Sequence, residues 1–309
     1  MFRANDEGGC AVTRLTGMTS PSVPNLRLEG LFAVLPTAFS DDGALDLAGT
    51  AALVEANVVA GAAGLTVLGV MGEAAELDAD ERRRVVETVL RAAGGRPIVV
   101  GVTGDDPGQV RDQAAAAATG RASGLMVSPS RGASLADAVD AAGTAGLPLV
   151  VQDYPVASGV RLTAEEIAAT AARQPLVVGA KIEAPPTSGK IAALRSLSPD
   201  LAVVGGLGGL FLIDELRAGA TGVMTGAAVP ERLVAIVESF AADPEAAERD
   251  WLAILPVLRL EAFTPFNLAA RKEIWRLRGV IESAHCRRAG AELDDRARAD
   301  IRRALESMS

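Results

Sequence analysis

The sequence is poor in the side chains that most enzymes use for acid–base and metal chemistry. Its 309 residues include one histidine, one tyrosine and two cysteines, and aromatic residues make up only 3%. Cys10 and Cys286 lie near opposite ends of the chain, so they form neither a CxxC motif nor a disulfide framework, which suits a reducing compartment. Histidine, cysteine and carboxylate residues nowhere show the spacing of metal ligands, and we expect neither a metal nor a cofactor.

The chain also lacks a basic segment and a long apolar segment. The net charge is −9 and basic residues do not cluster, which argues against nucleic-acid binding. No apolar run reaches the roughly 20 residues that a membrane span needs. The first 27 residues lack the apolar segment of a signal peptide and are rich in glycine, serine and proline. We therefore expect a cytoplasmic protein that acts on a small molecule and does not bind membranes, with residues 1–27 forming a disordered tail.

What the chain does contain is a regular alternation of short apolar runs with alanine-rich amphipathic segments. Eight such pairs within about 215 residues match the size of a (β/α)8 barrel, an α/β fold. A doubly wound open sheet is the alternative, but the even repeats and the lack of an early GxGxxG turn disfavour it. The expected strands are Gly30–Pro36, Leu65–Gly69, Pro97–Val102, Gly124–Ser128, Pro148–Gln152, Leu176–Lys181, Leu201–Gly205 and Thr221–Thr225.

After Glu245 the chain becomes more charged and purely helical. We expect a barrel over residues 28–245 and a C-terminal helical domain over residues 246–309. The helices expected in that domain are Asp250–Leu260, Ala269–Arg278 and Asp294–Ser307.

A lysine ends the sixth expected strand, Leu176–Lys181. Burial of an ammonium is costly, and an apolar barrel would keep this amine neutral. Lys181, Lys190 and Lys272 are the only lysines among 30 basic residues. Arginine cannot become a neutral amine, whereas a desolvated lysine can form a Schiff base with a carbonyl substrate. The alternative is that Lys181 only pairs with Glu183 or another neighbour at the barrel rim.

In a barrel of this kind, chemistry takes place at the carboxyl ends of the strands. Gln152 and Tyr154 follow the fifth strand with the same parity, so both are expected to face the barrel mouth near Lys181. Tyr154 is then the candidate for moving a proton, with Gln152 orienting the substrate; alternatively, the Tyr154 ring only caps the rim. A phenol needs a lowered pKa or a carboxylate partner, such as Glu73, to act as a base near neutral pH.

Several strand ends carry motifs in a fixed order, among which Lys181 stands with Gly179 before it and Glu183 after it. The others are Gly69–Glu73, Gln152–Pro155, Ala157–Val160, Gly205–Gly206 and Gly222–Met224. From about Leu28 to its end, the chain thereby resembles the dihydrodipicolinate synthase / N-acetylneuraminate lyase family of class I aldolases. The resemblance implies a (β/α)8 barrel with a C-terminal helical domain, usually a homotetramer, otherwise a homodimer. It also implies that Lys181 forms an imine with pyruvate or another 2-oxo acid.

The chain departs from the family at the Gly-Thr-Thr-Gly-Glu signature, where both threonines are replaced, by Val70 and Met71. In the family, the first threonine belongs to a proton relay and the second helps to bind the carboxylate of the 2-oxo acid. Here the backbone N–H groups of Met71 and Gly72 remain as expected carboxylate ligands, beside Val70. Gly206, at the end of the seventh strand, is expected to belong to the same substrate-binding pocket.

Other departures concern the second substrate. The family tyrosine of strand five is Gln152, and Tyr154 stands two residues later. Pro129–Arg131 has no tyrosine in place of the paired tyrosines that follow strand four in the synthases. The arginine that grips the aldehyde substrate of the synthases falls on Ala157. These departures predict a divergent branch without true dihydrodipicolinate synthase activity.

The sequence therefore predicts a lyase in which Lys181 forms a Schiff base with pyruvate or another 2-oxo acid and catalyses aldol cleavage or condensation. One alternative is a dehydratase or hydratase-aldolase acting on a sugar-derived or aromatic 2-oxo acid. Another is a catalytically idle barrel that binds such an acid as a sensor. The charged run Arg271–Glu273, with Arg276 and Arg278, is expected to form a solvated or intersubunit helix surface.

Overall fold

The computed structural model describes residues 26–262, 265–290 and 292–308 of the chain. The predicted disorder of the N-terminal tail therefore lies almost wholly outside the described residues. Leu26, near the end of that predicted tail, is already buried in the barrel interior.

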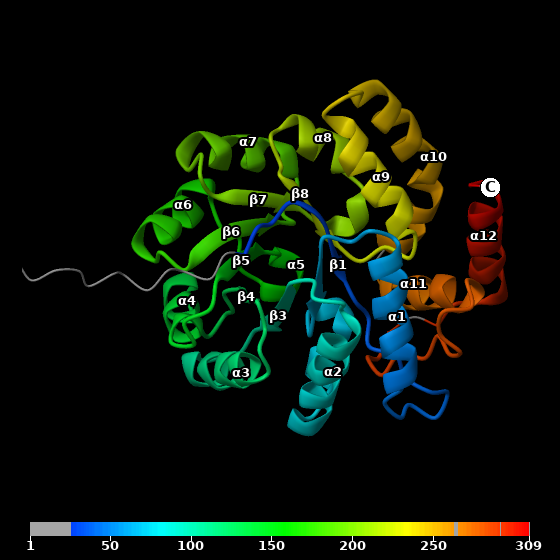
Figure 1. Ribbon diagram of the computed structural model, residues 1–309, viewed down its shortest axis with the longest axis horizontal. Coiled ribbons are helices and arrows are strands. Elements are labelled where there is room, and N and C mark those ends of the chain that lie inside the picture. Colours follow the sequence, from blue (N-terminus) through cyan, green and yellow to red (C-terminus); the bar gives the residue numbers. More distant parts are fainter. Residues whose placement is uncertain (1–25, 263–264, 291, 309) are drawn as a thin grey trace, which may run out of the picture.

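Eight parallel strands close into a barrel in the order of the sequence, with β1 paired to both β2 and β8. Helices surround the barrel on the outside (Figure 1). The predicted (β/α)8 fold is confirmed, and the open sheet is excluded because a closed barrel has no edge strands. The strands are β1 Gly30–Val34, β2 Gly64–Val67, β3 Ile98–Val102, β4 Gly124–Val127, β5 Leu149–Asp153, β6 Val177–Ile182, β7 Ala202–Gly205 and β8 Gly222–Thr225.

The helices begin where local capping signals place them. Asp78 and Glu81 form a complete capping box before α2, and Thr163 and Glu166 form another before α6. Pro230 opens α9 at a position where its missing N–H costs nothing. The helices between the strands are α1 Leu47–Val59, α2 Ala79–Ala92, α3 Pro107–Thr119, α4 Leu135–Gly143, α5 Pro155–Ser158, α6 Ala164–Arg173, α7 Thr187–Leu197, α8 Leu212–Arg217 and α9 Pro230–Phe240.

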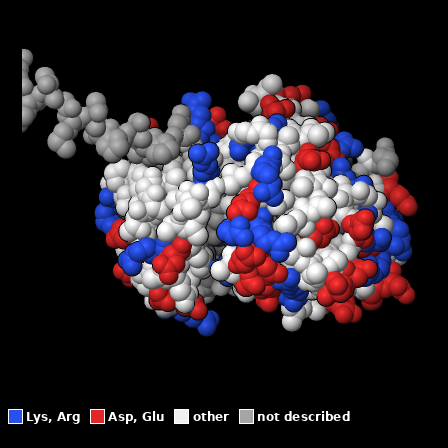
Figure 2. Space-filling view, turned by 60° about the horizontal axis from the view of Figure 1, so that its bottom comes forward, with Lys and Arg blue, Asp and Glu red and all other residues white. Residues whose placement is uncertain are grey.

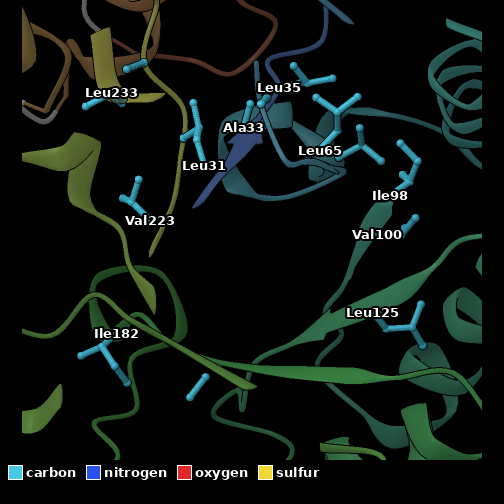
Figure 3. Close-up of a cluster of buried hydrophobic side chains, with 14 of the residues drawn as sticks. Leu31, Ala33, Leu35, Leu65, Ile98, Val100, Leu125, Ile182, Val223 and Leu233 are labelled. Carbon is cyan, nitrogen blue, oxygen red and sulfur yellow. The ribbon is translucent and has the colours of Figure 1, made fainter. Parts of the chain in front are cut away.

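The hydrophobic core has two layers because successive side chains of a strand face opposite sides. On β1, Leu31 and Ala33 pack outward against the helices, whereas Phe32 and Val34 fill the barrel interior. Figure 3 shows the outer layer distributed around the barrel wall, with side chains from β1, β2, β3, β4, β6 and β8. The interior layer consists of Leu26, Leu28, Phe32, Val34, Val99, Met126, Val150, Val204 and Met224.

Three further helices, α10 Pro244–Ala262, α11 Asn267–Leu277 and α12 Asp295–Glu306, pack on one side of the barrel beyond α9 (Figure 1). The Trp251 indole N–H donates to the carbonyl of Gly209 and thereby fastens α10 to the loop after β7. No helix within the described ranges combines the length and the apolar character that a membrane span requires. The division into a barrel domain and a separate C-terminal domain stays a prediction.

The central part of α11 corrects one prediction. Arg271, Lys272 and Glu273 are all buried, so they do not form a solvated or intersubunit helix surface. Arg276 and Arg278, named in the same prediction, are partly exposed and exposed, respectively. The error has a physical cause: α11 lies between the barrel mouth and the other C-terminal helices, so it is enclosed on most sides. Lys272 and Glu273 are accommodated by close ion pairs with neighbouring elements, whereas Arg271 lies 3.9 Å from the carboxylate of Glu261.

Candidate active site

Lys181 lies near the carboxyl end of β6, inside the mouth of the barrel. Its side chain is only 5% exposed, and Nζ lies 2.9 Å from Oε2 of Glu183. The pairing with Glu183, given above as the alternative, is therefore present, but inside the barrel mouth, and the neutral amine stays a prediction. The carboxylate of Glu183 is close enough to take up the proton that Lys181 must lose before it can act as a nucleophile.

Glu183 is held in place by several hydrogen-bond donors. Besides Lys181, the side-chain amide of Gln152 donates to Oε2 at 2.7 Å, and the N–H of Leu207 donates to Oε1 at 3.1 Å. The carbonyl oxygen of Gln152 in turn accepts from the hydroxyl of Ser128 at 3.0 Å. This network joins the ends of β4, β5, β6 and β7. It fixes the orientation of Gln152, so Gln152 acts on the chemistry through Glu183, while its predicted contact with substrate stays a prediction.

An inner cavity of about 120 Å3 lies above this network. It is lined by Lys181, Gln152 and Tyr154 together with Glu183 and by Arg271 from α11. An outer cavity of about 830 Å3 adjoins it and shares Gly69, Val70, Met126 and Gln152 with it. The arrangement provides a small chamber around the amine and a wider space into which the rest of a substrate can extend.

The loop after β2 brings only part of the predicted carboxylate site to the chamber. Val70 and Met71 line the inner cavity, but Gly72 does not. The N–H of Gly72 donates to the carbonyl of Gly69, and its own carbonyl accepts from the Thr37 hydroxyl at 2.6 Å. The expected use of the Gly72 N–H for substrate is therefore not supported by this geometry. The N–H of Met71 makes no hydrogen bond within the described part of the chain.

Gly206 also has a different place from the one expected. It is absent from the residues that line the cavity, and it packs against Glu183. A Cβ at this position would overlap the carboxylate of Glu183. Gly206 therefore allows Glu183 to reach Lys181, and its predicted contact with substrate has no support in this geometry.

Tyr154 lies directly before α5 and lines the inner cavity together with Lys181. Burial raises the pKa of its phenol above the ordinary value, and the charge of Glu183 raises it further, against smaller opposing effects of Arg288 and Arg271. A phenol with a raised pKa stays protonated near neutral pH. Tyr154 is therefore suited to donate a hydrogen bond or a proton, and less suited to act as a base.

Glu73, the expected carboxylate partner of Tyr154, is engaged elsewhere. Its Oε1 lies 2.5 Å from Nζ of Lys272, and its Oε2 accepts from the N–H of Arg288 at 2.7 Å. The ammonium of Lys272 also lies over the ring of Phe39, 4.5 Å from its centroid. Glu73 thus ties the loop after β2 to the C-terminal helices.

All three lysines of the chain turn out to form ion pairs in the protein interior. Lys190 lies 2.5 Å from the buried carboxylate of Asp153, in addition to the pairs of Lys181 and Lys272 described above. The scarcity of lysine therefore does not single out Lys181. Its position on a cavity does, since neither Lys190 nor Lys272 lines the inner or the outer cavity.

Comparison with known proteins adds an independent finding. The sequence model of the dihydrodipicolinate synthetase family matches residues 27–308. An L-2-keto-3-deoxyarabonate dehydratase from Azospirillum brasilense is 33% identical over 92% of this chain and 95% of its own length. A 4-hydroxy-tetrahydrodipicolinate synthase from Stenotrophomonas maltophilia is 31% identical over 78% and 82%, respectively. Among solved structures, a dihydrodipicolinate synthase from Rhodopseudomonas palustris superposes with a TM-score of 0.85 at 32% identity, covering 91% of this chain and 97% of that one.

Proposed function

The chain belongs to the dihydrodipicolinate synthetase family of Schiff-base lyases, and we propose that Lys181 is its nucleophile. The observation that carries this proposal is the position of Lys181 Nζ, on the inner cavity and 2.9 Å from a carboxylate. Membership in a family of enzymes sets the sensor alternative aside. The retained amine and its proton acceptor agree with that conclusion.

The first step is formation of an iminium on a 2-oxo acid. The Lys181 ammonium gives one proton to Glu183, and the neutral amine attacks C2 of the substrate. After proton transfer from nitrogen to oxygen, Glu183 returns its proton to the same oxygen, which leaves as water. The net change is the replacement of a carbonyl oxygen by nitrogen with release of one water. The cationic iminium then stands beside the carboxylate of Glu183, which stabilises it.

The iminium at C2 withdraws electrons from the bonds to C3, namely C3–C4 and C3–H. Breaking one or the other leads to two different lyase reactions. In aldol cleavage, a proton leaves the C4 hydroxyl, the C3–C4 bond breaks and an aldehyde departs. In dehydration, a proton leaves C3 and the C4 hydroxyl departs as water with a proton from a general acid. Tyr154, whose raised pKa keeps it protonated, is the donor that supports dehydration. The similarity to a keto-deoxy-sugar-acid dehydratase also supports this second candidate.

Borohydride trapping tests the nucleophile. Reduction in the presence of pyruvate should convert the iminium into a stable secondary amine, and peptide mapping should place the adduct on Lys181. Lys181→Arg should give no adduct, while Lys190→Arg should still be modified. An adduct on Lys190 or Lys272, or no adduct with any 2-oxo acid, would contradict the proposal.

The two reactions are separated by their products. Incubation with 4-hydroxy-2-oxo acids and 3-deoxy-2-oxo sugar acids should yield either two carbon fragments, one of them pyruvate, or one product lighter by a single water. Mass analysis distinguishes these outcomes directly. Because Ala157 stands where the synthases have an arginine, we expect no condensation of pyruvate with aspartate semialdehyde.

A further inference from the structure

Helix α11 delivers a buried guanidinium to the inner cavity. Arg271 is only 3% exposed, yet it lines this cavity together with Lys181. Its position over the carboxyl end of β8 follows from Gly226, where an added Cβ would lie 2.9 Å from a terminal nitrogen of Arg271. A charged side chain from outside the barrel thus reaches the chamber that holds the proposed nucleophile.

The guanidinium has a poorly matched partner in the protein. Its Nε makes no hydrogen bond among the described residues, and the carboxylate of Glu261 lies 3.9 Å away. The facing oxygen of Glu261 is likewise without a hydrogen bond within the described ranges, while its other oxygen accepts from the N–H of Ala228 at 2.8 Å. Burial of donors without acceptors is costly, and a planar guanidinium is matched by a planar carboxylate.

The chamber needs an anion-binding group. A 2-oxo acid carries its carboxylate next to the carbonyl that Lys181 attacks, so this carboxylate must also enter the chamber. Val70 and Met71 have no hydroxyl to offer, and the N–H of Gly72 is already bonded within its own turn. The N–H of Met71, which has no hydrogen bond among the described residues, is a single neutral donor and does not balance the charge of a carboxylate. Among the described residues that line the inner cavity, Lys181 and Arg271 are the only cations, and Lys181 is paired with Glu183.

We propose that Arg271 binds the C1 carboxylate of the 2-oxo acid and thereby replaces the carboxylate-binding hydroxyl that is missing at Met71. This proposal rests on the proposed function, since it takes the substrate to be a 2-oxo acid bound to Lys181. It assigns to the C-terminal helices a direct part in substrate recognition. The fork of the guanidinium donates to both carboxylate oxygens at once and fixes the orientation of C2 toward the amine.

The test compares two probes that share a ketone and differ in charge, pyruvate and pyruvamide. The concentration of each that gives half-maximal borohydride adduct on Lys181 is measured by intact mass for the full-length protein. In the wild type, pyruvate should reach half-saturation at a concentration at least tenfold below that of pyruvamide. Arg271→Lys keeps the charge but loses the planar fork of donors. It should raise the half-saturating concentration of pyruvate at least tenfold and leave that of pyruvamide within about twofold. A tenfold change corresponds to a loss of about 1.4 kcal/mol of binding free energy that is specific to the carboxylate.

A second variant distinguishes a loss of carboxylate binding from a folding defect. The pair Arg271→Met with Glu261→Gln removes both charges, so no uncompensated buried charge remains, and its melting temperature is recorded beside the trapping data. It should show the same selective loss for pyruvate. Arg259→Gln, which removes an exposed arginine on α10, is the matched control and should match the wild type with both probes.

The outcomes separate the two proposals. In one outcome, the wild type forms the adduct and both Arg271 variants keep its half-saturating concentration of pyruvate. This result would overturn the role of Arg271 and leave the proposed function standing. Equal losses for pyruvate and pyruvamide would show a merely structural role and would also overturn it. No adduct in the wild type with any 2-oxo acid would refute the proposed function, and the role of Arg271 with it.

Discussion

At the scale of single residues, the candidate site combines groups that the sequence singled out with groups that it did not. Lys181, Gln152 and Tyr154 meet at one cavity, as their positions at strand ends predict. The sequence offers Glu183 as a pairing partner of Lys181 at the barrel rim, and the structure places it in direct contact with Lys181 inside the barrel mouth. Lys181 and Glu183 stand two residues apart at the end of β6 and therefore share a face, but only the closed barrel makes that face an interior.

The role of Glu183 as proton carrier gives the first prediction. Glu183→Gln keeps the size of the side chain and an acceptor for the N–H of Leu207, but it removes the base. Turnover should fall about 10²–10⁴-fold, because general acid–base catalysis contributes that much. Trapping of pyruvate on Lys181 should become slower in parallel, as measured by quenched-flow borohydride reduction. Turnover within tenfold of the wild type would show that another group carries the proton.

A second prediction concerns Glu215, a fully buried residue of α8 beside β7, where Gly205 leaves room for its carboxyl group. Burial raises the pKa of Glu215 to about 8, although the nearby hydroxyl of Thr187 lowers it in part. The folded-state pKa is thus above that of an unfolded glutamate, about 4.3. Its contribution to stability is therefore complete below about pH 4 and is lost as the pH rises toward 8.

Glu215→Gln removes this pH dependence because glutamine does not ionise. Between about pH 4.5 and pH 8 the wild type should lose on the order of 3–5 kcal/mol of unfolding free energy relative to the variant. Urea denaturation of both proteins at a series of pH values measures the difference. Two curves that run parallel over this range would mean that Glu215 is ionised in the folded protein.

At the scale of elements, the loop after β2 depends on the C-terminal helices. This loop contains Val70 and Met71, and Glu73 follows it in a left-handed conformation with φ of 52°. The ion pair between Glu73 and Lys272 spans 199 residues of sequence and is fully buried on both sides. The C-terminal helices therefore hold the wall of the cavity in place, in addition to supplying Arg271.

Breaking this ion pair should be costly. Lys272→Met leaves Glu73 buried without its partner and should lower the unfolding free energy by about 3–5 kcal/mol. Combination with Glu73→Gln removes the stranded charge and should restore much of the loss. Urea denaturation of the two variants and of Glu73→Gln alone completes a double-mutant cycle. Additive effects of the two substitutions would show that the pair does not couple the loop to α11.

At the scale of the whole molecule, the barrel and the C-terminal helices together enclose the site. On the face shown in Figure 2, basic and acidic side chains are interspersed, so this face presents no extended basic area for nucleic acid. The homotetramer or homodimer and the cytoplasmic location stay predictions, which the family resemblance supports.

The assembly prediction is tested by light scattering. A homotetramer should give a molar mass about four times the 31.6 kDa of one chain at micromolar concentration. A homodimer would give twice that value, and dilution should not dissociate an assembly with a large apolar interface. A mass of one chain throughout the concentration range would contradict the prediction of an assembly.

The sequence by itself determined the barrel. The alternation of apolar strands with amphipathic helices and the place of Lys181 at a strand end are local patterns, and both predictions are confirmed. The capping boxes at Asp78 and Thr163 are local in the same way. These features depend on neighbouring residues, whose periodicity and hydrogen bonds act over a few positions, so they can be read without the rest of the chain.

Only the tertiary structure decided which charges lie inside. Arg271–Glu273 has the composition of a solvated helix face, yet the whole run is buried because the barrel mouth and the other C-terminal helices enclose it. Whether a charge meets water or a partner depends on segments far away in sequence, as with Lys272 and Glu73. The chemistry of the site therefore rests on long-range contacts that local pattern cannot specify, because solvent access and ion pairing arise only when the chain has closed on itself.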